Sequence, residues 1–125
     1  MNIELLKKLI LSNAIIEGLA GIIVLIQPAY LLYGSSTHID LPVINIGKLY
    51  GIAAIGQALF SYIIFKYGEN TSLIKFSVLI LIGFHLAVGL HYYGTFQSLP
   101  DIHIGIFIVH LLIAFVFAFL YLKYS

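Results

Sequence analysis

The chain has 125 residues, of which 62% are hydrophobic and 9% charged, and its formal net charge is +1. Soluble domains are about half apolar and one-quarter charged, so this composition indicates an integral membrane protein with one domain, residues 1–125. The chain contains no cysteine, which excludes disulfides, thiolate metal sites and iron–sulfur clusters. It also has no basic cluster, so we expect no nucleic-acid partner.

The first apolar segment, residues 9–27, is long enough to cross the ~30 Å hydrocarbon core of a bilayer. Two lysines precede it, as in a secretory signal, but Asn13 and Glu17 interrupt the run and no small-residue cleavage site follows. We therefore expect a retained membrane span. Pro28 is expected to end it, because proline has no amide hydrogen for the helix.

The second span is predicted over residues 43–65, with Gly68 as a helix cap. Small residues recur along it at helical spacing: Gly47, Gly51, Ala54, Ala58 and Ser61. Such a stripe lets two helix backbones approach closely in lipid. It therefore predicts close packing, either within the chain or between copies in a homo-oligomer.

The third and fourth spans are predicted over residues 73–93 and 99–122. The polar turn Glu69-Asn70-Thr71-Ser72 before the third span offers good N-cap residues, and residues 98–101 have the pattern of a capping box with proline in the first turn. Four apolar runs with short connections predict an all-α, up-down-up-down four-helix bundle.

The lysines fall unevenly on the two sides of this topology. One side carries Lys7, Lys8, Lys66, Lys75 and Lys123, whereas the other carries Lys48 alone. Positive residues gather on the cytoplasmic side of membrane proteins. We therefore expect a multi-pass protein of the inner (plasma) membrane, with both termini in the cytoplasm.

Each span carries one strongly polar residue close to its middle: Glu17, Gln57, His85 and His110. Such side chains are costly to expose to lipid, and the bundle interior lets them satisfy one another. Three more residues share helix faces with them: Asn13, Tyr50 and His103. The seven residues together predict a polar pocket near the middle of the membrane, for a ligand or for protons.

The sequence is compatible with several kinds of chemistry in this pocket. Glu17 is a candidate for proton exchange or for structural hydrogen bonds. His85 and His110 are candidates for haem or metal ligation, for a proton relay or for hydrogen bonding within the bundle. Helices packed at ~8–10 Å leave little room for haem between neighbours. The sequence has no H-E-x-x-H spacing and no compact ligand cluster, so it predicts no metal site.

Two glycine-containing segments carry a family resemblance. The first is Glu17-Gly18-Leu19-Ala20-Gly21, which leads to Gln27-Pro28, and the second is Gly47-Lys48-Leu49-Tyr50-Gly51 at the start of the second span. With the four-span architecture, they make the chain similar to the DoxX-like group of small membrane proteins. Some of these are membrane subunits associated with quinone-linked oxidoreductases. The resemblance thus implies a quinone-type ligand and identifies no catalytic residue.

Three functions therefore remain as hypotheses. The first is a membrane subunit that binds a quinone-type ligand within a larger redox complex and is not an enzyme on its own. The second is a proton-linked carrier or channel for small solutes. The third is a structural or assembly subunit without chemistry. The lipid bilayer is the expected partner in all three.

Overall fold

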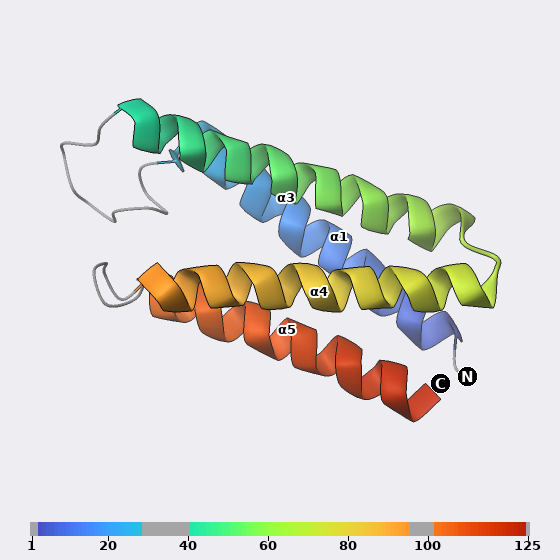
Figure 1. Cartoon of the computed structure of the whole chain (residues 1–125). Coiled ribbons are helices and arrows are strands. Elements are labelled where there is room, and N and C mark those ends of the chain that lie inside the picture. The colour runs from blue at the N-terminus through green and yellow to red at the C-terminus, as the bar shows by residue number, and fades with distance from the viewer. Residues whose placement is uncertain (1–2, 29–40, 96–101, 125) are drawn as a thin grey trace.

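The computed structural model describes residues 3–28, 41–95 and 102–124. They form four helices: α1 (Ile3–Ile26), α3 (Leu41–Tyr67), α4 (Thr71–Thr95) and α5 (Ile102–Tyr124) (Figure 1). Each helix is long and apolar enough to cross a membrane. The predicted all-α four-helix bundle of membrane type is confirmed.

Successive helices run in opposite directions, so α1 begins and α5 ends at the same side of the bundle as the turn between α3 and α4 (Figure 1). Five lysines belong to helix ends on this side: Lys7, Lys8, Lys66, Lys75 and Lys123. Lys48 lies near the start of α3, toward the other side. We call the first side the terminal end of the bundle.

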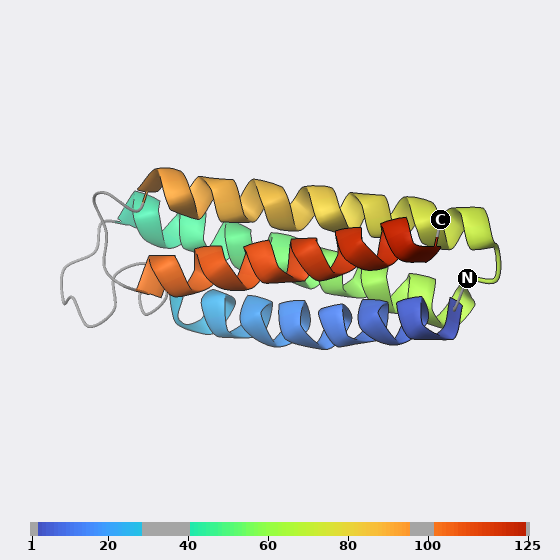
Figure 2. The same cartoon turned by 90° about the horizontal axis from the view of Figure 1, so that it is seen from below.

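The helices are arranged as two pairs. α1 packs along α3, and α4 packs along α5 (Figure 2), whereas the backbones of the two pairs come close to each other at few points. The first pair is close because Gly21 and Gly51 face each other. A Cβ atom on Gly51 would lie 2.9 Å from the carbonyl oxygen of Gly21, and one on Gly21 would lie 2.8 Å from that of Gly51. The predicted stripe of small residues therefore packs within the chain, against α1.

The apolar core fills the half of the bundle near the terminal end. Its buried members are Leu6, Ile10, Ile64, Ile74, Val78, Leu81 and Phe117. All four helices contribute to it, each with residues from its segment nearest the terminal end. This half is consequently filled mainly by hydrocarbon, and its buried Ser77 hydroxyl donates within its own helix to the Leu73 carbonyl.

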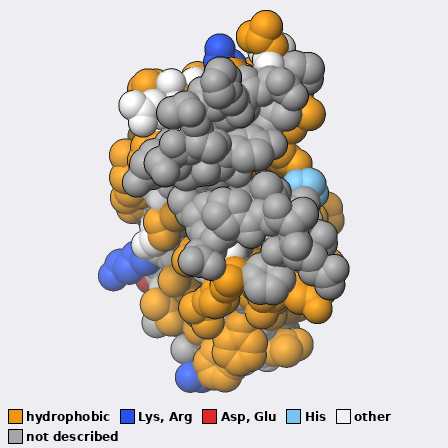
Figure 3. Space-filling view, turned by 90° about the vertical axis from the view of Figure 1, so that its left-hand side faces the viewer, with side chains coloured by type: hydrophobic (Ala, Val, Ile, Leu, Met, Phe, Trp, Pro, Cys, Tyr) orange, Lys and Arg blue, Asp and Glu red, His pale blue; other side chains and the backbone are white. Residues whose placement is uncertain are grey.

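The outer surface is also apolar. Large hydrophobic side chains point outward on every helix, for example Leu19, Ile52, Leu86 and Leu112. Hydrophobic side chains likewise predominate among the described residues visible from one end of the bundle (Figure 3). A helix that is apolar on all faces is suited to lipid rather than water. The chain is thus a multi-pass membrane protein.

The turn between α3 and α4 follows the predicted capping pattern. Oδ1 of Asn70 accepts hydrogen bonds from the backbone nitrogens of Ser72 at 2.8 Å and Leu73 at 3.4 Å. The amide of Gly68 donates to the carbonyl of Ile64 at 2.9 Å, and a Cβ on this glycine would collide with that oxygen. Both predicted caps are confirmed, and they hold the two helix pairs in register.

Candidate functional site

His85 lies at the centre of the bundle and is completely buried. Its Nε2 lies 2.7 Å from Oδ1 of Asn13 on α1, and its Nδ1 lies 2.8 Å from Nδ1 of His110 on α5. The His85 ring stacks on Phe117, with the ring centroids 6.2 Å apart. A single imidazole on α4 therefore connects three helices.

The hydrogen bonds fix where the protons lie in the neutral cluster. The Asn13 oxygen can only accept, so Nε2 of His85 carries a hydrogen and its Nδ1 carries a lone pair. Nδ1 of His110 must then donate to Nδ1 of His85. On the other side, Asn13 donates to the Ser61 hydroxyl at 3.2 Å, which also accepts from Gln57 at 3.4 Å. The network therefore runs without a break from α3 to α5.

Glu17 stands beside this network without joining it. The residue is 4% exposed, and its Oε1 lies 3.7 Å from Nδ1 of His85 and 4.0 Å from Nδ1 of His110. Among the described residues, none makes a hydrogen bond to its carboxyl group. A buried polar group without a hydrogen bond costs free energy. Glu17 is thus the polar group that a proton, a ligand hydroxyl or a cation would stabilise most.

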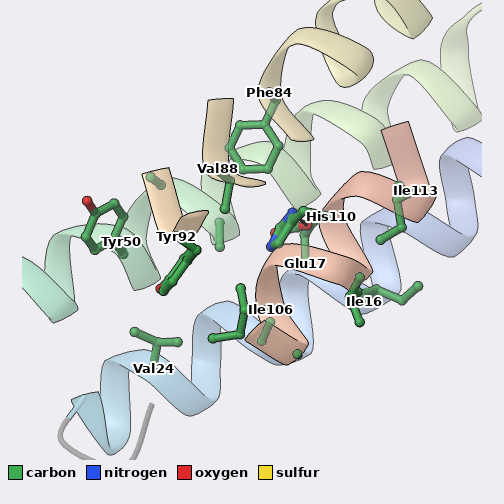
Figure 4. A pocket seen from close by; sticks show the side chains of 15 residues that line it. Ile16, Glu17, Val24, Tyr50, Phe84, Val88, Tyr92, Ile106, His110 and Ile113 are labelled. Carbon is green, nitrogen blue, oxygen red and sulfur yellow. Dashed lines mark ion pairs between the residues drawn. The ribbon is translucent and has the colours of Figure 1, made fainter. Parts of the chain in front are cut away.

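A cavity of about 380 Å³ lies next to the cluster, between the two helix pairs. Figure 4 shows Glu17 and His110 toward one part of it and Tyr50 and Tyr92 toward the other. The rest of the wall is almost entirely apolar and comes from all four helices. Binding sites for small molecules are usually apolar cavities of about 300–1,000 Å³ with a few polar groups. This cavity, which we call the central pocket, has that form.

The tyrosine end of the central pocket is held by a second polar contact. The hydroxyl of Tyr50 lies 2.9 Å from Nε2 of His91, and the two rings are 5.5 Å apart. This contact links α3 to α4 at the end opposite the terminal end. Tyr50 therefore takes part in the pocket through its wall and not through the histidine cluster.

The structure brings together five of the seven residues that the sequence suggested, namely Asn13, Glu17, Gln57, His85 and His110. Tyr50 lies at the far end of the central pocket, and the side chain of His103 lies outside the described residues. Sequence reasoning missed Ser61 as a polar link and Tyr92 as a wall residue. Ser61 shares a helix face with Tyr50 and Gln57, and this spacing was the available signal; nothing in the spacing distinguished Tyr92.

The cluster restricts which cofactors fit. The two Nδ1 atoms of His85 and His110 are 2.8 Å apart, too close to hold an iron porphyrin between them. Glu17, His85 and His110 nevertheless each offer one ligand atom, and these atoms lie within 4.8 Å of one another. Sequence reasoning placed these three residues near one depth but predicted no metal site, because the ligands come from three different helices and lack a recognisable spacing along the chain.

Comparison with protein-family models, curated proteins and solved structures gives no significant match to this chain. The similarity to the DoxX-like group accordingly stays a prediction. The function has to be argued from the central pocket and its polar cluster.

Proposed function

We propose that this protein is a membrane subunit that binds a small lipophilic ring compound of quinone type in the central pocket. One observation carries the proposal: an apolar cavity of suitable size has in its wall the carboxyl group of Glu17, which lies next to His110 and makes no hydrogen bond to a described residue. An apolar ring matches the walls, and an oxygen substituent on it matches the carboxyl and imidazole groups.

The two ends of the central pocket suit the two oxygens of a 1,4-quinone. Such a ring carries one oxygen at each end, and the pocket has Glu17 and His110 in one part and Tyr50 and Tyr92 in the other. Tyrosine hydroxyls can donate to a quinone carbonyl, and a carboxylate can accept from the hydroxyl of the reduced form. Both oxidation states of the ligand thus have partners in the pocket.

A lateral groove supports access from the membrane. A second cavity, of about 170 Å³, is lined only by residues of α1 and α5, including Ser12, Ile16 and Val116. Ile16 also lines the central pocket, so the two cavities share a wall. A lipophilic ligand that enters this groove from the bilayer is separated from the central pocket by the side chains of Ile16 and Ile113.

The alternative of a proton-linked carrier is less well supported. A carrier or channel needs a path to both sides of the membrane, whereas the apolar core fills the terminal half of the bundle. Glu17 and His110 line the central pocket on the other side of this core, and Asn13 lines the second cavity, which lies between α1 and α5. The described helices therefore favour a binding site closed at one end.

The lysine distribution supports an orientation in the inner membrane with both termini in the cytoplasm. The central pocket then lies in the outer half of the membrane. Electrons for a quinone would come from a redox-active partner subunit in the same membrane, with this chain supplying the binding site.

The test of the proposal is binding of a short-tailed benzoquinone to the purified protein in detergent. Gly105 lines the central pocket, and a Cβ atom added there meets no atom within 4 Å. Gly105→Leu should therefore place its side chain in free space at the pocket and weaken binding about tenfold or more. Gly83→Leu is the matched control, because Gly83 is equally open but does not line the pocket.

Saturable binding at one quinone per chain, weakened by Gly105→Leu and unchanged by Gly83→Leu, is the expected result. Absence of saturable binding, or equal affinities of the two variants, would contradict the proposal. Extraction of the membrane-purified protein with organic solvent adds a second readout, since a bound native quinone would be recovered in the extract.

A further inference from the structure

We propose that Glu17, His85 and His110 together bind one divalent transition-metal ion, with an open coordination position that faces the central pocket. This metal site goes beyond quinone binding, because it can exist whether or not a quinone enters. It is built from α1, α4 and α5, so the ion would join both helix pairs.

The distances between the three ligand atoms fit a metal ion. Nδ1 of His85 and Nδ1 of His110 are 2.8 Å apart, and Oε1 of Glu17 lies 3.7 and 4.0 Å from them. A triangle with these sides has its centre about 2.1 Å from each corner, which equals the ~2.0–2.2 Å bonds of zinc to imidazole and carboxylate ligands. An ion above this plane would lie farther from all three atoms, so a tetrahedral site needs the Glu17 oxygen to approach the two nitrogens by about half an ångström while the nitrogens separate by a similar amount.

The donor set defines the class of metal. Two imidazoles and one carboxylate bind the ion in catalytic zinc sites and in many non-haem iron(II) sites. Such three-ligand sites leave at least one position for water or a substrate oxygen. Because Glu17 and His110 line the central pocket, that position lies where a small molecule can reach it.

Asn13 already holds His85 in the form that a metal requires. By accepting from Nε2, the Asn13 oxygen fixes the hydrogen there and leaves the lone pair of Nδ1 directed into the cluster. His110 donates from its Nδ1 in the metal-free cluster, so metal binding requires its hydrogen to move to Nε2. Both histidines then bind as neutral ligands, and neither changes its charge.

The position of Glu17 also favours a cation at this point. It is buried, makes no hydrogen bond to any described residue, and has both histidine nitrogens as its nearby partners. A cation between the three groups would neutralise the carboxylate and use its free lone pairs. One carboxylate leaves a divalent ion with a net positive charge, which favours an anionic oxygen at the open position.

The experiment uses chelator-treated full-length protein in detergent, without a histidine tag and without quinone, titrated with Zn²⁺. We expect one ion per chain, and we expect Co²⁺ to give the visible absorption of a four-coordinate site. Glu17→Gln and His110→Gln should each weaken Zn²⁺ binding by about 100-fold or more, since each removes a direct ligand.

His91→Gln is the matched control, because it removes a histidine that lies outside the cluster and should leave affinity unchanged. Absence of zinc binding in the wild-type protein would overturn the proposal. Equal losses in His91→Gln and His110→Gln would also overturn it. Circular dichroism checks that each variant is folded; if Glu17→Gln unfolds, His110→Gln and the wild-type Co²⁺ spectrum decide. Quinone binding is measured separately, so either proposal can fail alone.

Discussion

Nδ1 of His85 lies 2.8 Å from Nδ1 of His110, and the other nitrogen of His85 lies 2.7 Å from the Asn13 oxygen. His85 is thereby bonded to both helix pairs, whose backbones come close to each other at few points. In lipid, no hydrophobic effect drives helices together, so polar contacts of this kind help to align them. The same imidazole therefore has a structural role and a place in the proposed site.

His85→Leu should lower the stability of the bundle by about 2–4 kcal/mol. The substitution introduces an apolar side chain of similar size, and it leaves the Asn13 oxygen and the His110 nitrogen without their partner. The free energy of unfolding in detergent, followed by circular dichroism, measures the effect.

His91→Leu provides the comparison for this stability measurement. His91 is exposed and its ring bonds to the Tyr50 hydroxyl, so its loss should cost about 1 kcal/mol or less. Equal losses for the two substitutions would show that burial in the central cluster adds nothing to the bundle.

Gly51→Ala should destabilise the α1–α3 pair by about 1–3 kcal/mol. The new Cβ would lie 2.9 Å from the Gly21 carbonyl oxygen and 3.0 Å from the Leu25 nitrogen, so the two backbones must move apart. Gly56→Ala on the same helix is the control, because its Cβ meets nothing within 4 Å. It should be neutral or raise stability by about 1 kcal/mol through helix propensity. A neutral Gly51→Ala would contradict the close approach.

The fold was predictable because hydropathy and capping act locally. Four apolar runs and the caps at Gly68 and Asn70 define the helices directly. Helix ends were harder to predict: α1 begins at Ile3, whereas the predicted span began at residue 9. The apolar run marks only the part that crosses the hydrocarbon, and a helix continues beyond it where backbone hydrogen bonds persist. The predicted cap at residues 98–101 lies outside the described residues.

The depth of the site residues in the membrane was predictable, but the rotation of each helix about its axis was not. Counting residues placed Glu17, Gln57, His85 and His110 near one level of the membrane, and helical spacing placed Asn13 with Glu17. Which atoms meet depends on how each helix is turned about its axis, and this is set by packing between helices. The three-ligand grouping therefore emerges only from the structure.

Asn13→Ala tests the positioning role of this residue in the proposed metal site. Asn13 touches no ion itself, but it sets the tautomer of His85. Its removal should weaken Zn²⁺ binding by about 10–100-fold, while Ser61→Ala, one bond further away, should have a smaller effect. Isothermal titration with Zn²⁺ measures both. An effect of Ser61→Ala as large as that of Asn13→Ala would indicate a general loss of packing instead.

The membrane orientation can be tested with single cysteines, because the natural chain has none. Ser72 is exposed at the terminal end, whereas Ser36 belongs to the connection at the opposite end and lies outside the described residues. In intact cells, a membrane-impermeant maleimide should label Ser36→Cys and should label Ser72→Cys only after permeabilisation. Labelling of both positions from the same side would contradict the four-span topology.

Glu17→Leu separates a binding role from a structural one. Leucine is apolar and similar in size, and the carboxyl that it replaces makes no hydrogen bond to any described residue. Replacing a whole set of buried ionic groups by well-packed apolar ones often stabilises a protein by about 1–4 kcal/mol. Beside the neutral pair of His85 and His110, removal of Glu17 leaves no uncompensated charge behind. We expect a gain of about 1–2 kcal/mol in unfolding free energy, together with loss of Zn²⁺ binding and weaker quinone binding.

The opposite result would assign Glu17 to the structure. If the carboxylate only holds His85 and His110 in place by charge, its removal must lower stability, and binding would fall because the cluster loosens. Glu17→Gln distinguishes these cases further, since it keeps the shape and removes the negative charge. A stable Glu17→Gln protein that still binds Zn²⁺ would exclude the carboxylate as a ligand. A stable one that does not would show that this buried group is retained for binding, at a cost to stability.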